Sequence, residues 1–322
     1  MSYHVIIASM DKDKVTVEIR EITESEAGQR IDNFLLRILK GVPRSRVYRA
    51  IQSGEVRINK KRVDAKDRIN TGDMVRIPPI RTAVRAPVKL EPHLTQMLKD
   101  RIIYEDDTLL VLDKPSGLAV HGGSGLTLGV IEALRLIYPK AKLELVHRLD
   151  RDTSGCLMIA KKRSQLLFLH EALREGHVAK KYITLLIGRW PAEQTYVDLP
   201  LHKNILSSGE RMVKVDSEGK ASKTLFHLIK HVGTMSLMEV TLMTGRTHQI
   251  RVHAAYKGHP VAGDEKYGDK TANQVLRTKG LKRLFLHAAE LVIPTKDGSS
   301  ITVKADLDEK LSGFIDYVES RL

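Results

Sequence analysis

The sequence predicts an α+β protein in which a small basic α/β module precedes a larger domain built on a mixed, largely antiparallel sheet. The chain has 322 residues and is 42% hydrophobic, which is enough apolar material for two separate cores. Near the N-terminus, apolar residues recur at helical spacing. After residue 101, short apolar runs typical of strands outnumber the helical segments and interleave with them irregularly.

The N-terminal module is predicted to hold two short helices and a curled hairpin. Apolar residues recur at helical spacing over 29–39, and a second helix is expected from Ser45, its candidate cap, to Gly54. Alternating segments at 56–58 and 74–77 predict the hairpin. The domain boundaries that we expect are an arm over 1–17, the module over 18–80, an extended proline-rich linker over 81–100 and the second domain over 101–322.

The charge balance favours a polyanionic partner. The formal net charge is +14 and the pI is about 9.7. Because Lys and Arg contacts to phosphates release counterions, nucleic acid is the first expectation and an acidic membrane the second. Basic residues gather between positions 40 and 68, where so dense a cluster should repel itself unless a polyanion compensates it. The candidate binding residues of this module are Arg44, Arg46, Arg49, Arg57, Lys60, Lys61 and Arg62.

The cysteine count and the hydropathy indicate where the protein works. Cys156 is the one cysteine, so an intramolecular disulfide and a thiolate metal cluster are both excluded. No stretch approaches the ~18 apolar residues of a membrane span, and the N-terminus lacks the pattern of a signal peptide. We therefore expect a cytoplasmic protein without a membrane partner.

The candidate catalytic loop is HRLDRDTSG, residues 147–155. It lies between two apolar runs, 143–146 and 156–160, each of the length of a buried strand. The loop is dense in ionisable side chains and ends at Gly155, which permits a backbone turn that other residues resist. Scaffolds present catalytic groups on such loops, although a solvated turn whose charges pair with one another would have the same composition.

Three kinds of site compete for this loop. A zinc site would draw on several histidines, but His248 and His253 are five positions apart, which places them on different faces of a helix. A carboxylate pair, Asp150 with Asp152, would resemble a glycosidase, yet nothing sets one of the two apart as an acid. The third kind is a single essential carboxylate, Asp150, paired with an arginine and acting on a base taken out of its stack.

Other segments bear on ligands. The glycine-rich stretch 121–125 precedes a predicted helix, as phosphate-binding loops do, but no Lys-Ser or Lys-Thr follows Gly125, so a nucleotide cofactor is not expected. Residues 203–223 are polar and predict an exposed hairpin. Thr247 is the expected cap of a helix that runs to Tyr256.

Several motifs carry a resemblance to known families. AGQRIDNFL and SRVYRAIQSGEVRINKKRV, within 18–80, resemble S4-like RNA-binding domains. HRLDRDTSG resembles the signature of pseudouridine synthases of the ribosomal large subunit type. KPSG (114–117) precedes that signature, while KKY (180–182) and GRTHQIRVH (245–253) follow it, in the order of the family. Residues 1–17 fall outside the resemblance.

The resemblance implies an enzyme that isomerises uridine in RNA, without a metal or an organic cofactor. It matches Asp150 to the essential aspartate, which acts as a nucleophile or as a base, and Arg251 to its bidentate arginine partner. Tyr182 matches the tyrosine that packs on the target uracil, whose hydroxyl is a candidate proton acceptor. Arg148 matches a residue that fills the gap left by the flipped base.

The implied substrate is large-subunit ribosomal RNA or its precursor, bound by a monomer. His147, Arg151 and Lys114 are the further candidate substrate-binding residues. Two alternatives stay open: a transfer-RNA substrate for the same reaction, and a non-catalytic RNA-binding factor of ribosome assembly. The second is disfavoured because the catalytic residue types are all present.

Overall fold

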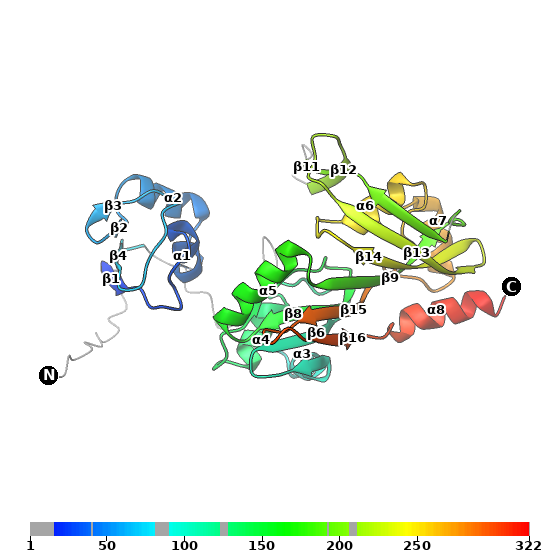
Figure 1. Ribbon diagram of the computed structural model, residues 1–322, viewed down its shortest axis with the longest axis horizontal. Helices are drawn as coiled ribbons and strands as arrows, with labels where there is room; N and C mark the ends of the chain where they lie inside the picture. The colour runs from blue at the N-terminus through cyan, green and yellow to red at the C-terminus, as the bar shows by residue number, and fades with distance from the viewer. Residues whose placement is uncertain are drawn as a thin grey trace. The chain divides into compact units, whose positions relative to one another are not determined.

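The computed structural model describes residues 16–39, 41–80, 90–122, 128–191, 193–205 and 211–321, without the side chains of residues 205 and 211. The chain divides into two compact units between Lys89 and Leu90, and each unit has a core of its own. Figure 1 shows the elements of both. Parts of the expected arm (1–15), linker (81–89), glycine-rich loop (123–125) and hairpin (206–210), together with Lys40, lie outside the described residues.

The first unit contains the two predicted helices, packed on an antiparallel sheet of order β1-β4-β2-β3. Alternate residues of the sheet face the helices, so Val75 and Ile77 are buried, while Met74, on the opposite face of the same strand, is exposed. The small α/β module expected here is confirmed. Its elements are β1 (Glu18–Glu21), α1 (Ile31–Ile38), α2 (Arg44–Gln52), β2 (Arg57–Ile58), β3 (Lys61–Arg62) and β4 (Met74–Ile77).

The cap predicted for the second helix is wrong. Helix α2 begins at Arg44, one residue before Ser45, and Pro43 occupies the cap position without any side-chain hydrogen bond to the helix. Proline suits this place because its ring fixes φ and its missing N–H would have no partner in the first turn.

The second unit is built on a ten-stranded sheet of order β10-β13-β14-β9-β15-β8-β6-β5, with β16 paired to β15 and β7 to β8. Its described pairings are antiparallel except that of β8 with β15, so the predicted mixed, largely antiparallel sheet is confirmed. The strands are β5 (Ile102–Glu105), β6 (Leu109–Lys114), β7 (Glu144–Leu145), β8 (Ser154–Ala160), β9 (Ala179–Ile187), β10 (Gln194–Asp198), β13 (Lys223–Val232), β14 (Met235–Leu242), β15 (Leu286–Pro294) and β16 (Ser300–Lys304).

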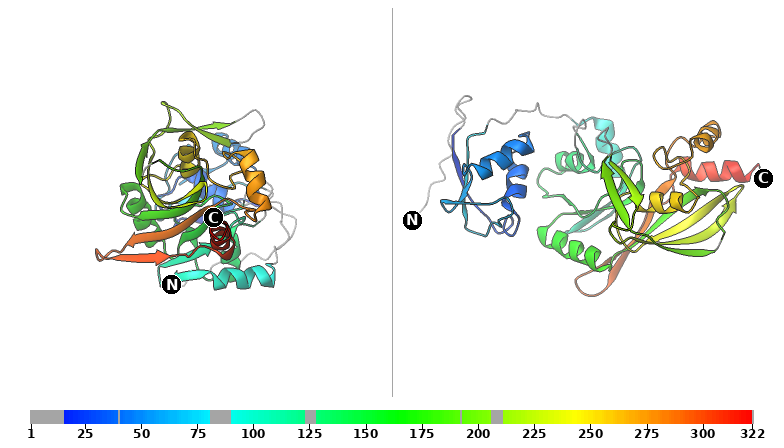
Figure 2. Two further views of the ribbon diagram at one scale, coloured as in Figure 1. Left: turned by 90° about the vertical axis from the view of Figure 1, so that its right-hand side faces the viewer. Right: turned by 90° about the horizontal axis from the view of Figure 1, so that it is seen from above.

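Helices cover both faces of this sheet, as Figures 1 and 2 show. Successive strand residues point to opposite faces, so Leu110 and Leu112 of β6 enter one core while Leu109 and Val111 enter another. Burial on both faces explains why these strands read as unbroken apolar runs. The helices are α3 (Pro92–Asp100), α4 (Val130–Ile137), α5 (Arg163–Glu175), α6 (Gln249–Tyr256), α7 (Lys270–Thr278) and α8 (Glu309–Glu319).

The structure differs from the extended linker expected over 81–100. Its last part forms α3, whose Leu98 is fully buried in the core of the second unit with Leu94 and Met97 packed beside it. The apolar residues of this helix occur at i, i+3 and i+4, a helical spacing that the preceding prolines obscured. The second unit therefore begins before residue 101.

The candidate catalytic loop joins β7 to β8, next to the parallel pairing of β8 with β15, in which Ser154 and Gly155 lie opposite His287 and Ala288. Gly155 has φ +103°, and a Cβ at this position would lie 2.2 Å from the backbone oxygen of Ala288. A residue without a side chain thus lets the loop enter β8 against β15.

Candidate active site

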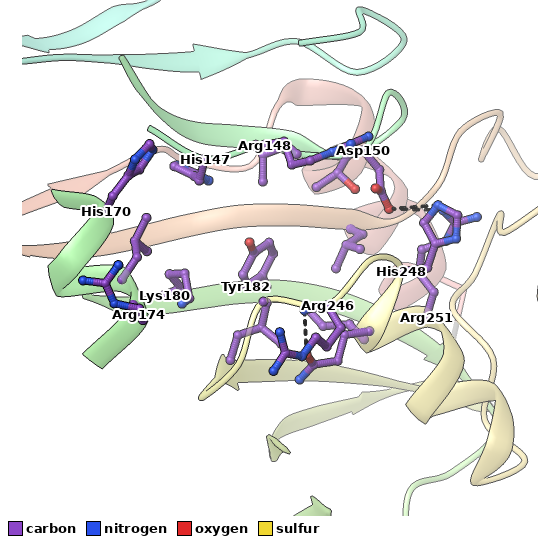
Figure 3. A pocket seen from close by; sticks show the side chains of 18 residues that line it. His147, Arg148, Asp150, His170, Arg174, Lys180, Tyr182, Arg246, His248 and Arg251 are labelled. Atoms are coloured by element: carbon purple, nitrogen blue, oxygen red, sulfur yellow. Dashed lines mark hydrogen bonds and ion pairs between the residues drawn. The ribbon is translucent and has the colours of Figure 1, made fainter. Parts of the chain in front are cut away.

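One pocket of about 410 Å³ gathers residues from the candidate catalytic loop, β9, α5 and the segment that leads into α6. Figure 3 shows Asp150, His248 and Arg251 at one end of it and His170, Arg174 and Lys180 at the other, with Tyr182 between them. Sequence motifs far apart in the chain therefore meet in one cavity.

Asp150 lies at the end of the pocket formed by the loop and α6. Its side chain is 21% exposed, and its Oδ2 lies 3.3 Å from Nη1 of Arg251, which donates a hydrogen bond to it. Nε2 of His248 lies 3.7 Å from the same oxygen. The carboxylate is therefore oriented from the side of α6 and still reachable from the cavity.

The bidentate partner of Arg251 is Asp264, which differs from the prediction that Arg251 would hold Asp150 in this way. Nε and Nη2 of Arg251 donate to the two oxygens of Asp264 at 2.7 and 2.8 Å. Asp264 is 1% exposed and also accepts hydrogen bonds from the amides of Lys266 and Tyr267. The fully buried carboxylate takes two guanidinium N–H groups, which leaves Nη1 for Asp150.

Tyr267 connects this ion pair to His248. The guanidinium carbon of Arg251 lies 5.1 Å from the centre of the Tyr267 ring, and the Tyr267 hydroxyl lies 2.7 Å from Nδ1 of His248. The same hydroxyl accepts a hydrogen bond from the amide of Val213. The hydroxyl thus joins the amide of Val213 to the His248 ring, whose Nε2 lies on the side of Asp150. Burial lowers the pKa of His248, so the ring is neutral at neutral pH.

The helix that carries these residues does not begin as predicted. Thr247 is not the cap: the cap position is His248, with φ +55°, and α6 starts at Gln249. The Gln249 side chain instead accepts hydrogen bonds from the Thr244 hydroxyl and the Arg246 amide. This buried glutamine fixes the turn, and the left-handed backbone at His248 aims its ring at Asp150.

Tyr182 lies in the middle of β9, paired with Val240 of β14 and Ala288 of β15, and is 8% exposed. Burial, with the charge of Asp150 as a second cause, raises the pKa of its hydroxyl well above the ordinary value. The phenol is therefore neutral, and its ring forms an apolar wall of the pocket next to the carboxylate.

His147 and Arg148 both line the pocket, in different ways. Nε2 of His147 accepts a hydrogen bond of 3.1 Å from the amide of Met158, and burial and the charge of Lys180 lower the pKa of the ring to about 4. His147 is thus a neutral part of the loop scaffold. Arg148 also lines the pocket but is exposed, so its guanidinium is open to a ligand.

Lys114 and Arg151 do not line the pocket, in contrast to their expected contact with substrate. Lys114 is fully buried, and its Nζ donates to the backbone oxygens of Pro115, Leu118 and Arg151 at 2.8–2.9 Å. Nε of Arg151 donates to the oxygen of Gly117 at 3.0 Å. These two side chains tie the KPSG turn to the catalytic loop. Lys114 has no donor left for a ligand, whereas Arg151 is exposed and uses only Nε in this contact.

The hairpin expected over 203–223 is formed by β11 (Leu201–Ile205) and β12 (Arg211–Val215). Its Val213 amide is the group that holds the Tyr267 hydroxyl. The hairpin is therefore linked to the Asp150 end of the pocket through two hydrogen bonds.

The basic residues of the first unit lie mostly in solvent. Six of the seven predicted binding residues are exposed, whereas Arg46 is half-buried and pairs with Glu55 at 2.8 Å. Arg44 and Arg49 of α2 have no ion pair within the described ranges. These cations are available to a polyanion.

Sequence reasoning missed Asp264, Tyr267 and the role of His248. The first two lie in the loop after α6, in GDEKYG, where no periodicity marks them. The one available signal was a carboxylate beside a glycine and shortly before a tyrosine, a pattern too common to single out. The sequence suggested His248 only as a metal ligand.

Within the residues that the structure describes, no group of three or more His, Cys, Asp or Glu side chains could hold a metal ion, and no helix could span a membrane.

The profile of the family described as RNA pseudouridylate synthase matches residues 108–256, and that of the S4 domain matches residues 29–75. Ribosomal large subunit pseudouridine synthase C from Salmonella typhi is 51% identical over 318 residues, which cover 97% of this chain and 100% of the relative. The protein of the same name from Haemophilus influenzae is 49% identical over 304 residues, with 93% and 94% coverage.

Two solved human structures are similar to this chain in sequence and fold. RNA Pseudouridylate Synthase Domain Containing 1 has 27% sequence identity and a TM-score of 0.57, covering 70% of this chain and 90% of that one. RNA Pseudouridylate Synthase Domain Containing 4 has 25% identity and a TM-score of 0.60, covering 70% and 95%.

Proposed function

Because the chain belongs to the RNA pseudouridylate synthase family, we propose that its pocket isomerises uridine to pseudouridine in large-subunit ribosomal RNA. The observation that carries the proposal is the contact of Asp150 with Arg251 inside a pocket that also contains Tyr182. Relatives named for the large ribosomal subunit match nearly the whole chain, S4 domain included, which supports this RNA over transfer RNA. The proposed form is a cytoplasmic monomer.

In the proposed reaction the bond from ribose C1′ to uracil N1 breaks, the uracil turns, and a bond from C1′ to C5 forms, while C5 loses its proton and N1 gains one. Asp150 is the group placed to act, as a nucleophile or as a base. Its 3.3 Å hydrogen bond from Arg251 fixes one carboxylate oxygen of a side chain that lines the cavity.

Two further side chains have proposed roles in holding the flipped base. The Tyr182 ring would pack on the uracil beside Asp150, and its neutral hydroxyl would take part in moving the proton of C5. Arg148, exposed at the rim, would stack in the gap that the base leaves in the RNA.

The decisive test uses RNA labelled with tritium at uracil C5, because only formation of the bond from C1′ to C5 requires release of that tritium. The purified chain should release it from large-subunit ribosomal RNA and not from transfer RNA. Release from transfer RNA alone would favour that substrate. Tight binding of ribosomal RNA without release from either would favour a non-catalytic assembly factor.

The basic helix of the first unit gives a separate prediction. Replacing Arg44 and Arg49 together by Gln should weaken binding of large-subunit RNA and lower the slope of log Kd against log salt by up to about 0.9 per lost phosphate contact. The turnover number should stay unchanged because neither residue belongs to the pocket. The control replaces Lys279 and Lys310, exposed residues of the second unit, by Gln. Equal salt slopes in the two double variants would rule out this helix as a docking surface.

A further inference from the structure

Lys180 is a buried cation that the proposed chemistry does not use. It lies on β9 two residues before Tyr182, so both side chains point to the same face of the sheet and line the pocket. The residue is only 7% exposed. In the described parts of the chain, no carboxylate forms an ion pair with it and no group accepts its hydrogen bonds.

Lys181, the next residue of β9, is a lysine that does have carboxylate partners. Lys181 points to the opposite face of β9, where its Nζ lies 3.5 Å from Glu239 and 3.6 Å from Glu290. That side chain is also more exposed than Lys180. The unpaired lysine is thus the more deeply buried of the two, the reverse of what stability alone would favour.

The groups around Lys180 do not balance its charge. Burial lowers the pKa of its ammonium group. His147 beside it is neutral, and Arg174 of α5, which lines the same end of the pocket, pairs with Glu171 at 3.4 Å and brings no counterion to Lys180. Figure 3 shows this end of the pocket opposite Asp150. The cavity therefore has the carboxylate of Asp150 at one end and, at the other, a Lys180 cation that no described carboxylate pairs with.

We propose that Lys180 binds a phosphodiester oxygen of the RNA strand next to the target uridine. This inference rests on the proposed function and adds a substrate-binding subsite to it. A full negative charge is required, since a uracil carbonyl would leave the buried ammonium group uncompensated. Lysine binds phosphate as a point charge, and exposed Arg174 at the mouth would attract the same strand. With Tyr182 between them, Lys180 would hold the backbone while Asp150 acts on the flipped nucleotide.

The test compares Lys180→Met, which keeps the length of the side chain and removes its charge, with Lys180→Arg and with Lys181→Met as the matched control. Lys180→Met should raise Kd and KM for transcribed large-subunit ribosomal RNA about tenfold and lower the salt slope of binding by about 0.7–0.9. The turnover number should change little. Lys180→Arg should restore most of the affinity, and Lys181→Met should leave the salt slope as it is.

Thermal unfolding without RNA separates binding from structure. Lys180→Met should raise the melting temperature, because it removes an unpaired buried charge, whereas Lys181→Met should not. A melting temperature lowered in Lys180→Met, or a lower turnover number with an unchanged salt slope, would overturn the proposal in favour of a structural role or a contact with the base. Binding and unfolding need no turnover. Absence of tritium release by the unaltered chain would therefore count against the proposed function and leave this test intact.

Discussion

Asp150→Asn should lower the rate of tritium release from large-subunit RNA by a factor on the order of 10³ or more, while the fold and the RNA affinity stay nearly intact. The amide has almost the size of the carboxylate but is neutral and a poor nucleophile and base. Its oxygen can still accept the hydrogen bond from Nη1 of Arg251, so the loop should keep its shape. Single-turnover tritium release, with RNA binding and thermal unfolding measured on the same preparation, would check all three.

Asp152→Asn is the matched control for this experiment. Asp152 lies in the same loop and is exposed, and its backbone oxygen, which the substitution keeps, accepts a hydrogen bond from Ser116. Loss of the Asp152 charge should lower the stability by no more than ~1–3 kcal/mol, the value of a charged hydrogen bond, and the rate by no more than a few-fold. If both variants lost activity equally, the loop would matter for its structure and Asp150 would not be the catalytic carboxylate.

The sequence predicted the architecture well because its signals are local. Unbroken apolar runs over 109–112 and 156–160 are strands buried on both faces, and the helical period near the N-terminus became α1. The family resemblance then brought together residues that no spacing could place. Asp150 and Arg251 are 101 positions apart in the sequence and meet only in the folded chain, where Arg251 donates a hydrogen bond to Asp150. The matching family profiles and the similar proteins confirm the family and the S4 domain.

The sequence could not reveal which polar side chains hold the backbone and which are open to a ligand. Lys114 belongs to a motif and looked like a substrate contact, yet all its donors are used by backbone oxygens. Lys180 and Lys181 are adjacent and chemically identical, and only the pairing of β9 decides that one faces the pocket and the other faces two glutamates. The cap predicted for α6 was wrong for a similar reason, because the turn before this helix is fixed by the side chain of Gln249 and not by Thr247.

Asp264→Asn should have the second large effect, on stability and activity together. The substitution removes the charge that balances the buried guanidinium of Arg251 and places an N–H donor against the donors of that group. Breaking one side of a buried ion pair typically costs about 3–5 kcal/mol. Arg251 would then turn toward Asp150, the nearest remaining carboxylate, and displace it. A misplacement near 1 Å costs about 10²-fold in rate.

The pH dependence of unfolding distinguishes this ion pair from simple packing. Burial would raise the pKa of Asp264, but Arg251 and the amide hydrogen bonds outweigh it and hold that pKa below the ordinary value of 3.8. A carboxylate with a lowered folded pKa stabilises the protein above its unfolded pKa, and this contribution disappears as the pH falls through the folded pKa. The stability difference between the parent and Asp264→Asn should therefore be full above about pH 5 and shrink below about pH 4. Glu265→Gln, next to it and exposed, should show neither the stability loss nor the pH dependence. A difference that stayed constant down to pH 2 would mean that Asp264 supports the site by its shape and not by its charge.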